Sequence, residues 1–295
     1  MPSMLFHLAA VERLTLDGRK LVPDVARALS EDVVYARLGA ALPILPAFGG
    51  MRGRLASFRH RPPTAFARLL HAGAPGSLAF KMAELVSNGA LVGREAGLAF
   101  VAGYVAHVCI DRAMEPVLAA LVRRGRAHGE SELDARERLA WAQTVWLHRD
   151  LYGQDVLGTA GLRPRLQLVK RPGLPRGVGK GLFELLRVSC QATFGEVPSQ
   201  AEVDDWVRGA WAYALLLSGP WGRLRAFRSA LAHPRDVVFR GPEVDVPAAL
   251  EVALGDVRQA LEEVARVVSA GRFTPRSKLQ FLAALPDAPV VPCAG

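Results

Sequence analysis

The sequence predicts an all-α protein built as a multi-helix bundle. Hydrophobic residues make up 51% of its 295 residues, whereas aromatic residues make up only 7%. Most apolar residues recur at the three- to four-residue spacing of a helix, and the alternation typical of half-buried strands is scarce. An aliphatic core of this kind favours helices over β-sandwiches, because strands draw more on aromatic side chains. The length fits one large domain or two small ones.

The expected helices can be followed in order along the chain. Ser3 is suited to cap the first helix, which is expected to end near Leu14. Prolines and glycines over 42–63 predict a loop region. Further helices are expected at 24–38, 64–72, 77–92, 96–122, 131–152, 181–192, 200–217, 246–270 and 275–285, with a short extended piece at 236–239.

Residues 159–180 are expected to connect two helical parts, 1–158 and 181–285. The stretch 162–180 carries six cations and no acid, and its prolines and glycines disfavour a helix. A solvated linker is the simpler interpretation, and a loop that faces phosphate or lipid headgroups is the alternative. The helices of the second part are expected to pack on the same bundle, and 286–295 are expected to form a flexible tail.

The chain is basic, with 37 Lys and Arg residues against 28 Asp and Glu residues and a formal charge of +9. This balance fits an anionic partner such as nucleic acid or a membrane surface. However, only five of the cations are Lys, and a sequence rich in Arg and Ala can also follow from coding bias. Aromatic residues are not interleaved with the basic stretch, which argues against nucleic acid as a partner.

Three features together favour a cytoplasmic location. The cysteines are odd in number and widely spaced, at Cys109, Cys190 and Cys293, which does not suggest a disulfide framework. The first residues lack the cationic start of a secretory signal. The longest apolar stretch, 96–110, is shorter than the roughly 20 residues that a membrane span requires.

The segment 103–118 contains the most informative polar residues. His107, Asp111 and Glu115 are spaced four residues apart, and each such step turns only about 40° around a helix, so the three side chains share one side. The surrounding residues are apolar, which predicts that these polar groups are buried and need partners or a metal ion. A hydrogen-bonded ladder of the three side chains is the alternative to a metal site.

Other histidines offer weaker indications. His148, Tyr152 and Asp155 would share one face of a helix, with an exposed polar face as the alternative. His60 lies where the Pro- and Gly-rich loop meets the start of the next expected helix, and His7 lies on the first helix. Each histidine taken alone is more often structural than functional.

His71 is expected near a helix C-terminus, where the helix dipole favours an imidazolium. Motifs for a serine nucleophile elbow, a P-loop, a dinucleotide-binding turn and the HExxH zinc helix are absent from the sequence. The sequence therefore gives no support to those four classes of site.

Five segments, taken in order, resemble the zinc-dependent phospholipase C family in its short bacterial form. They are PSMLFH, LGAALPILPAF, RHRPPTAFARLL, GYVAHVCIDRAMEP and WLHRDLYGQDVLG, all within 1–158. The resemblance implies the helical fold that this family shares with single-strand-specific zinc nucleases. It also implies that metal-activated water attacks a phosphodiester. The implied partners are a phosphoester or phospholipid substrate and an anionic membrane surface.

The resemblance also assigns site residues. Its ligand positions fall on His7, His60, His107, Asp111 and His148, with Asp111 as a carboxylate that bridges two metals. Glu115 stands where the family has a histidine, and it can still bind zinc through oxygen.

Two ligand positions of the family are changed to residues that do not ligate well. Ile44 replaces an aspartate, and Tyr152 replaces a glutamate. A phenol with a pKa near 10 is a poor ligand at neutral pH but can donate a hydrogen bond. One or two zinc ions are therefore expected in place of three, with Asp111 and Tyr152 as the catalytic residues.

Two functions follow from this reading. The first is a zinc-dependent phosphoester hydrolase, and the second is a family member that has lost catalysis and acts as a binding or scaffold protein. Both leave the headgroup and the oligomeric state open. Convergence of the histidines and Asp111 on one pocket would favour the first.

Overall fold

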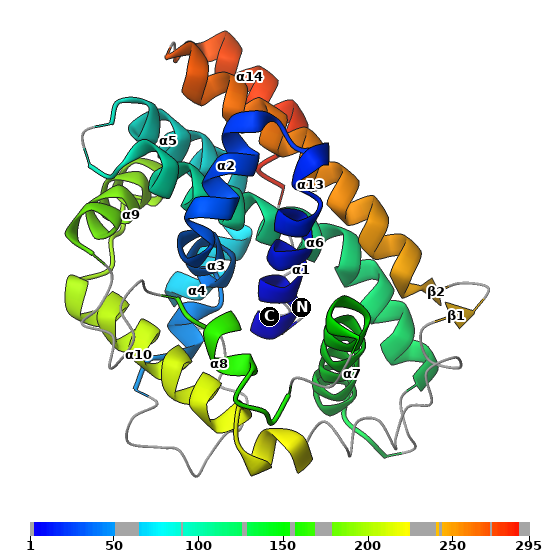
Figure 1. Cartoon of the computed structure of the whole chain (residues 1–295). Helices are drawn as coiled ribbons and strands as arrows, with labels where there is room; N and C mark the ends of the chain where they lie inside the picture. The colour runs from blue at the N-terminus through cyan, green and yellow to red at the C-terminus, as the bar shows by residue number, and fades with distance from the viewer. Residues whose placement is uncertain are drawn as a thin grey trace.

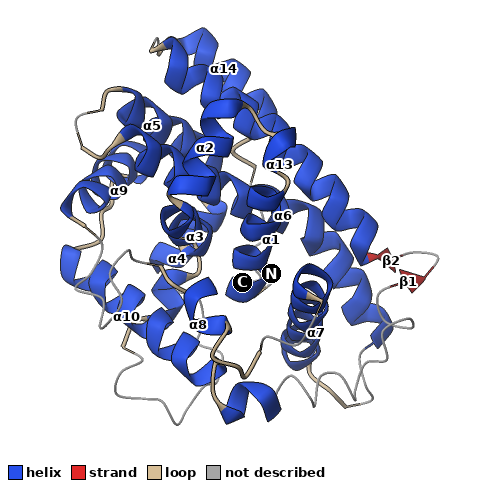
Figure 2. Cartoon of the chain, viewed as in Figure 1, coloured by secondary structure: helices blue, strands red, loops and turns tan. Residues whose placement is uncertain are grey.

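The protein is described by a computed structural model. It describes residues 3–50, 65–89, 91–125, 129–153, 157–168, 179–224, 240–241, 244–271 and 273–288. These residues are mostly helical (Figure 2). Within them the strands are β1 (Arg240–Gly241) and β2 (Val244–Asp245), which pair antiparallel. The predicted all-α class is confirmed, and the likeness to one particular helical fold stays a prediction.

The N-terminal helix begins where the sequence indicates. Helix α1 (Met4–Leu16) follows Ser3, whose hydroxyl accepts a hydrogen bond from the backbone N–H of Phe6. The same hydroxyl lies 2.6 Å from that of Thr144, so the cap also ties α1 to a distant helix. A polar residue at a helix start thus fixes both the local structure and the position of α1.

The single helix expected over 24–38 is two helices, which is a correction. Helices α2 (Pro23–Glu31) and α3 (Val33–Ala41) meet at Asp32, whose backbone φ and ψ of −126° and 34° are not helical. Pro23 starts α2 at a position where its missing N–H costs nothing. The break lets α3 change direction and lie against the centre of the bundle.

Helix α6 (Arg94–Gly125) is the central element, and α1, α2, α3, α5, α7 and α13 all contact it (Figure 1). Two glycines allow α3 to approach it closely. A Cβ atom added at Gly103 would overlap the carbonyl oxygen of Ala36, and one added at Gly39 would overlap that of Phe100. The backbones of α3 and α6 are therefore in direct contact, which places carbonyl groups of α3 beside α6 side chains.

The remaining elements complete the bundle. They are η1 (Gly18–Lys20), η2 (Leu45–Phe48), α4 (Ala65–Ala72), α5 (Pro75–Ser87), α7 (Glu132–Tyr152), α8 (Leu162–Arg165), α9 (Lys180–Phe194), α10 (Gln200–Leu217), α13 (Val246–Ala270) and α14 (Pro275–Ala284).

The basic stretch expected to lack a helix starts with the short α8. Pro164 fits there because the first turn of a helix needs no N–H donor. The rest of that stretch, 169–178, and the extended piece expected at 236–239 lie outside the described residues.

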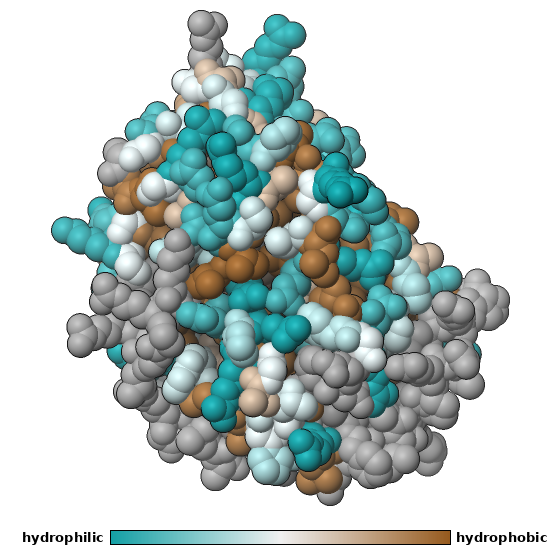
Figure 3. Space-filling view, in the orientation of Figure 1, coloured by the Kyte–Doolittle hydropathy of each residue, from teal (hydrophilic) through white to brown (hydrophobic). Residues whose placement is uncertain are grey.

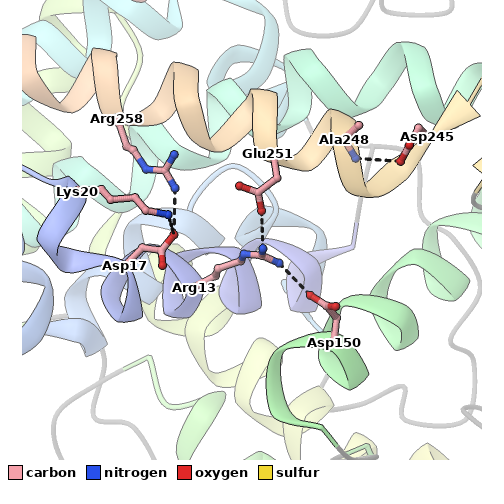
Figure 4. Close-up of polar contacts among 8 residues, drawn as sticks. All are labelled: Arg13, Asp17, Lys20, Asp150, Asp245, Ala248, Glu251 and Arg258. Atoms are coloured by element: carbon pink, nitrogen blue, oxygen red, sulfur yellow. Dashed lines mark hydrogen bonds and ion pairs between the residues drawn. The ribbon is translucent and has the colours of Figure 1, made fainter.

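Helices from the second part of the chain contact those from the first. Helix α13 contacts α6, α5 and α2, and α9 contacts α5. Figure 4 shows two arginines that join α1 to its neighbours. Arg13 lies 2.9 Å from Asp150 of α7 and also contacts Glu251 of α13. Arg258 of α13 lies 3.1 Å from Asp17 at the end of α1.

The surface carries both hydrophobic and hydrophilic residues. On the face seen in Figure 3, small hydrophobic groups lie between hydrophilic residues. The most exposed large hydrophobic side chains, Leu16, Val252 and Leu279, belong to three different helices. In the described part of the chain, no helix combines the length and the hydropathy that a membrane span needs.

Candidate metal centre

The centre of the candidate site lies on α6. His107 and Asp111 are one helical turn apart and buried, as their spacing predicts. Nε2 of His107 lies 3.1 Å from Oδ2 of Asp111. Because α6 is surrounded by other helices, both side chains point into the bundle interior. The sequence therefore predicted this pair and its burial correctly.

Helix α1 adds His7 to this pair. Nε2 of His7 lies 3.1 Å from Oδ1 of Asp111, the oxygen that His107 does not face. The two imidazole rings stack, with centroids 3.9 Å apart and planes 22° apart. His7, His107 and Asp111 thus form a buried group whose ligand atoms lie within 4.8 Å of one another, and this group can hold a metal ion.

His71 also belongs to this cluster, which the sequence analysis missed. Its Nε2 lies 3.2 Å from Nε2 of His107 and 3.6 Å from Oδ2 of Asp111. His71 does lie at the end of α4, but that end is buried against α6, where the hydroxyl of Tyr104 donates to the carbonyl of Leu70. The apolar neighbours Leu69 and Leu70 are the sequence signal that could have indicated burial.

Backbone carbonyls fix the tautomers of two histidines. Nδ1 of His107 lies 2.6 Å from the carbonyl oxygen of Ala40 on α3, and Nδ1 of His71 lies 2.9 Å from that of Ala67. A carbonyl only accepts, so each Nδ1 carries the proton and each neutral ring keeps a lone pair on Nε2. The close approach of α3 and α6 at Gly39 and Gly103 makes the first of these bonds possible.

Burial keeps these two rings neutral. It lowers the pKa of His71 to about 4, with the neighbouring His107 adding to the effect. Burial and then the proximity of His7 lower the pKa of His107. The lone pairs of two Nε2 atoms and one oxygen of Asp111 therefore face one another across 3.1–3.6 Å.

Asp111 and His7 lack ordinary hydrogen bonds. Within the described residues, neither oxygen of Asp111 and neither ring nitrogen of His7 has a hydrogen-bond partner of acceptable geometry. Burial raises the pKa of Asp111, but His107 and His7 outweigh it and hold this pKa well below its usual value. A buried polar group without a good hydrogen bond costs about 1–3 kcal/mol, and a cation bound between the imidazoles and the carboxylate would offset this cost.

The spacing of the donor atoms fits a metal ion. A tetrahedral ion with bonds of about 2.0–2.1 Å has donors about 3.3 Å apart, by the geometry of a tetrahedron. His7 and His107 each lie 3.1 Å from a different oxygen of Asp111, and His71 lies 3.2 Å from His107 and 3.6 Å from Asp111. Imidazoles oriented by a second hydrogen bond are the usual form of a histidine ligand. The cluster therefore resembles a preformed coordination site.

Glu115 lies one turn beyond Asp111 on α6, but the group of close ligand atoms does not include it. Its carboxylate contacts the guanidinium of Arg136 on α7. The structure thus gives Glu115 a role in an ion pair, where the sequence analysis expected a metal ligand.

The group of close ligand atoms does not include His148 of α7 either. Nε2 of His148 donates to the carbonyl of Leu5 at 3.2 Å, and burial lowers its pKa to about 4. Tyr152 packs beside this ring, with the guanidinium of Arg165 4.1 Å from its ring centre. Ile44, at the start of η2, packs against the core as its apolar side chain requires.

His60 and Asp155 lie outside the described residues. Comparison of the chain with family models, with curated proteins and with solved structures finds no match.

Proposed function

We propose that this chain is a metal-dependent phosphoester hydrolase of the phospholipase C type. We further propose that one zinc ion is held by His7, His107 and Asp111. The observation that carries the proposal is the convergence of imidazole nitrogens and a carboxylate in the bundle core. Zinc suits this set because it accepts nitrogen and oxygen donors in tetrahedral geometry. The phosphoester substrate is supported by the ordered resemblance over 1–158.

His71 decides whether the site is open or closed. With three protein ligands, the fourth position stays available, as in catalytic zinc sites. A zinc ion held by these residues would supply the activation of water and the stabilisation of negative charge on phosphate oxygens. In this arrangement Nε2 of His71, which bears a lone pair, is placed to accept a proton at that position. The negative charge of Asp111 would offset part of the charge of the ion. Its two oxygens face His7 of α1 and His107 of α6.

A second candidate function is a binding or scaffold protein with a structural metal. The burial of the cluster favours it, because even His71 is only 7% exposed. If His71 is a fourth ligand, the coordination sphere is closed, as in structural zinc sites. The side chains of Ile44 and Tyr152, which do not join the cluster, agree with this alternative.

The first experiment measures metal content and turnover of the full chain. We expect one zinc ion per chain by elemental analysis. We also expect hydrolysis of bis(p-nitrophenyl) phosphate that a chelator abolishes and added zinc restores. Protein without a stoichiometric divalent metal would contradict both functions.

The variant His71→Ala separates the two functions. In the hydrolase it keeps the zinc ion and loses most of the turnover, since a general base contributes about 10²–10⁴-fold. In the scaffold protein the wild type shows no turnover, and the variant binds zinc more weakly. His148→Ala is the control, because its ring nitrogen bonds to a backbone carbonyl apart from the cluster.

A further inference from the structure

We infer that Arg136 supplies the second positive charge of this site and binds an anionic oxygen of the substrate, in place of a second metal ion. The inference rests on the proposed function and names how the site recognises its substrate. The expected ligand class is a phosphate ester, whose oxygens a guanidinium can bind in a bidentate manner.

The position of Arg136 follows from the spacing on α6. Glu115 lies one turn after Asp111, and neighbouring positions of this kind are about 5–6 Å apart at Cβ. Arg136 of α7 contacts Glu115, so its guanidinium is held at the carboxylate that lies one turn after Asp111 on α6. Burial lowers the pKa of Arg136, and the negative charge of Asp111 partly opposes this shift.

Arg136 takes the place that a second cation would need. Glu115 is the next carboxylate along α6 that could bind a second ion, and it is in contact with a guanidinium. A second divalent ion at this point would face the positive charge of Arg136 at close range. The cluster of His7, His107 and Asp111 is then a site for one metal ion, with an arginine beside it.

The exposure of the side chains gives the direction of approach. His107 and Asp111 are buried, whereas Glu115 and Arg136 are 14% and 23% exposed. The Glu115–Arg136 pair is thus closer to solvent than the cluster is. A guanidinium has five N–H donors in a planar fork, and one carboxylate occupies at most two of them. Arg136 therefore keeps donors for an incoming oxyanion.

Gln143 gives an independent indication of a polar occupant. It lies seven residues after Arg136, two turns along the same face of α7, and it is fully buried. Among the described residues, neither atom of its amide has a hydrogen-bond partner. Gln143 is thus a more deeply buried position of α7 than Arg136. An unpartnered buried amide there suits a bound water or an ester oxygen.

The test uses the full chain and inorganic phosphate as the probe, in isothermal titration calorimetry with and without added zinc. Arg136→Gln is expected to weaken phosphate binding by roughly 10- to 100-fold, the range for a lost charge-assisted pair. The matched control is Arg138→Gln, which removes the same charge from the same helix. Arg138 pairs with Glu130 at a similar exposure, 29% and 17%, and is expected to leave phosphate affinity within about twofold.

Two further variants keep the test valid if Arg136→Gln folds poorly. The double variant Glu115→Gln with Arg136→Gln removes both charges of the pair and should show the same loss. Glu115→Gln alone should keep the zinc content at one ion per chain, because this carboxylate pairs with Arg136. Loss of zinc in Glu115→Gln would make Glu115 a ligand and overturn the inference.

Failure of this inference and failure of the proposed function give different results. Zinc bound at one ion per chain, with equal phosphate affinity in Arg136→Gln and wild type, overturns the role of Arg136 alone. Two zinc ions per wild-type chain also overturn it. A chain without zinc contradicts the hydrolase, and the phosphate titration of that metal-free chain still decides the role of Arg136. Absence of phosphate binding by the wild type in both conditions overturns the inference.

Discussion

Two regions of the bundle carry histidines with the same helical spacing to a polar neighbour, yet their structures differ. On α6, His107 and Asp111 meet His7 and His71 from other helices and form a cluster rich in lone pairs. On α7, His148 donates to a backbone carbonyl and packs beside Tyr152. Spacing places two side chains on one face of a helix. The donors that neighbouring helices add decide whether that face becomes a site.

The largest expected effect is a difference in zinc affinity between a variant of the α6 region and a variant of the α7 region. His107→Ala should lower zinc affinity by more than about 100-fold, since even residues that only support a ligand contribute 10- to 100-fold. His148→Ala should leave zinc affinity unchanged within a few-fold. Competition with a chromophoric chelator measures both. Equal losses in the two variants would mean that the regions form one site.

The next effect tests the packing that orients His107. Gly103→Ala adds a Cβ atom that overlaps the carbonyl of Ala36, so α3 must move away from α6. We expect a loss of about 1–3 kcal/mol in the free energy of unfolding, as for an overpacked core, together with weaker zinc binding. Chemical denaturation measures the first quantity, and chelator competition measures the second.

The control for Gly103→Ala is Gly255→Ala, at a helical position with open space around the added atom. It should stabilise the protein by up to about 1 kcal/mol, because Ala favours a helix more than Gly does. An unchanged zinc affinity in Gly103→Ala would contradict the link between helix approach and the orientation of His107.

A pH effect is expected from the α7 region. His148 has a pKa of about 4 in the folded chain against 6.5 for an unperturbed histidine, so the unfolded chain binds its proton first. The contribution of His148 to the free energy of unfolding is complete above pH 6.5. It is lost as the pH falls toward 4, by roughly 3 kcal/mol in all. His148→Gln should therefore lose less stability than wild type between pH 7 and 4. Urea unfolding at both pH values measures this difference, and equal losses would contradict it.

The smallest effect concerns the surface ion pairs that join α1, the helix of His7, to α7 and α13 (Figure 4). Arg13→Ala removes contacts with Asp150 of α7 and Glu251 of α13, and all three side chains are partly exposed. Exposed pairs contribute about 0–1 kcal/mol each, so we expect a loss of at most about 1–2 kcal/mol and no change in zinc affinity. Thermal unfolding measures the loss, and a larger one would show that these contacts position α1.

Much of the local structure was predictable because it depends on neighbours in sequence. Ser3 starts α1 by capping its first turn, and the spacing of His107 and Asp111 places both in the core. The break between α2 and α3 at Asp32 was not predicted, since the residues around it fit one helix equally well. Its reason is tertiary, because α3 follows α6 along a contact between glycines.

The sequence alone determined the helical class and the pairing of His107 with Asp111, because the period of a helix sets which side chains share a face. Only the tertiary structure decided that His71 joins this pair, that Glu115 turns to Arg136, and that His148 is satisfied by a carbonyl. Those outcomes depend on distances of a few ångströms between helices far apart in the chain. Core packing sets these distances, and no local pattern encodes them.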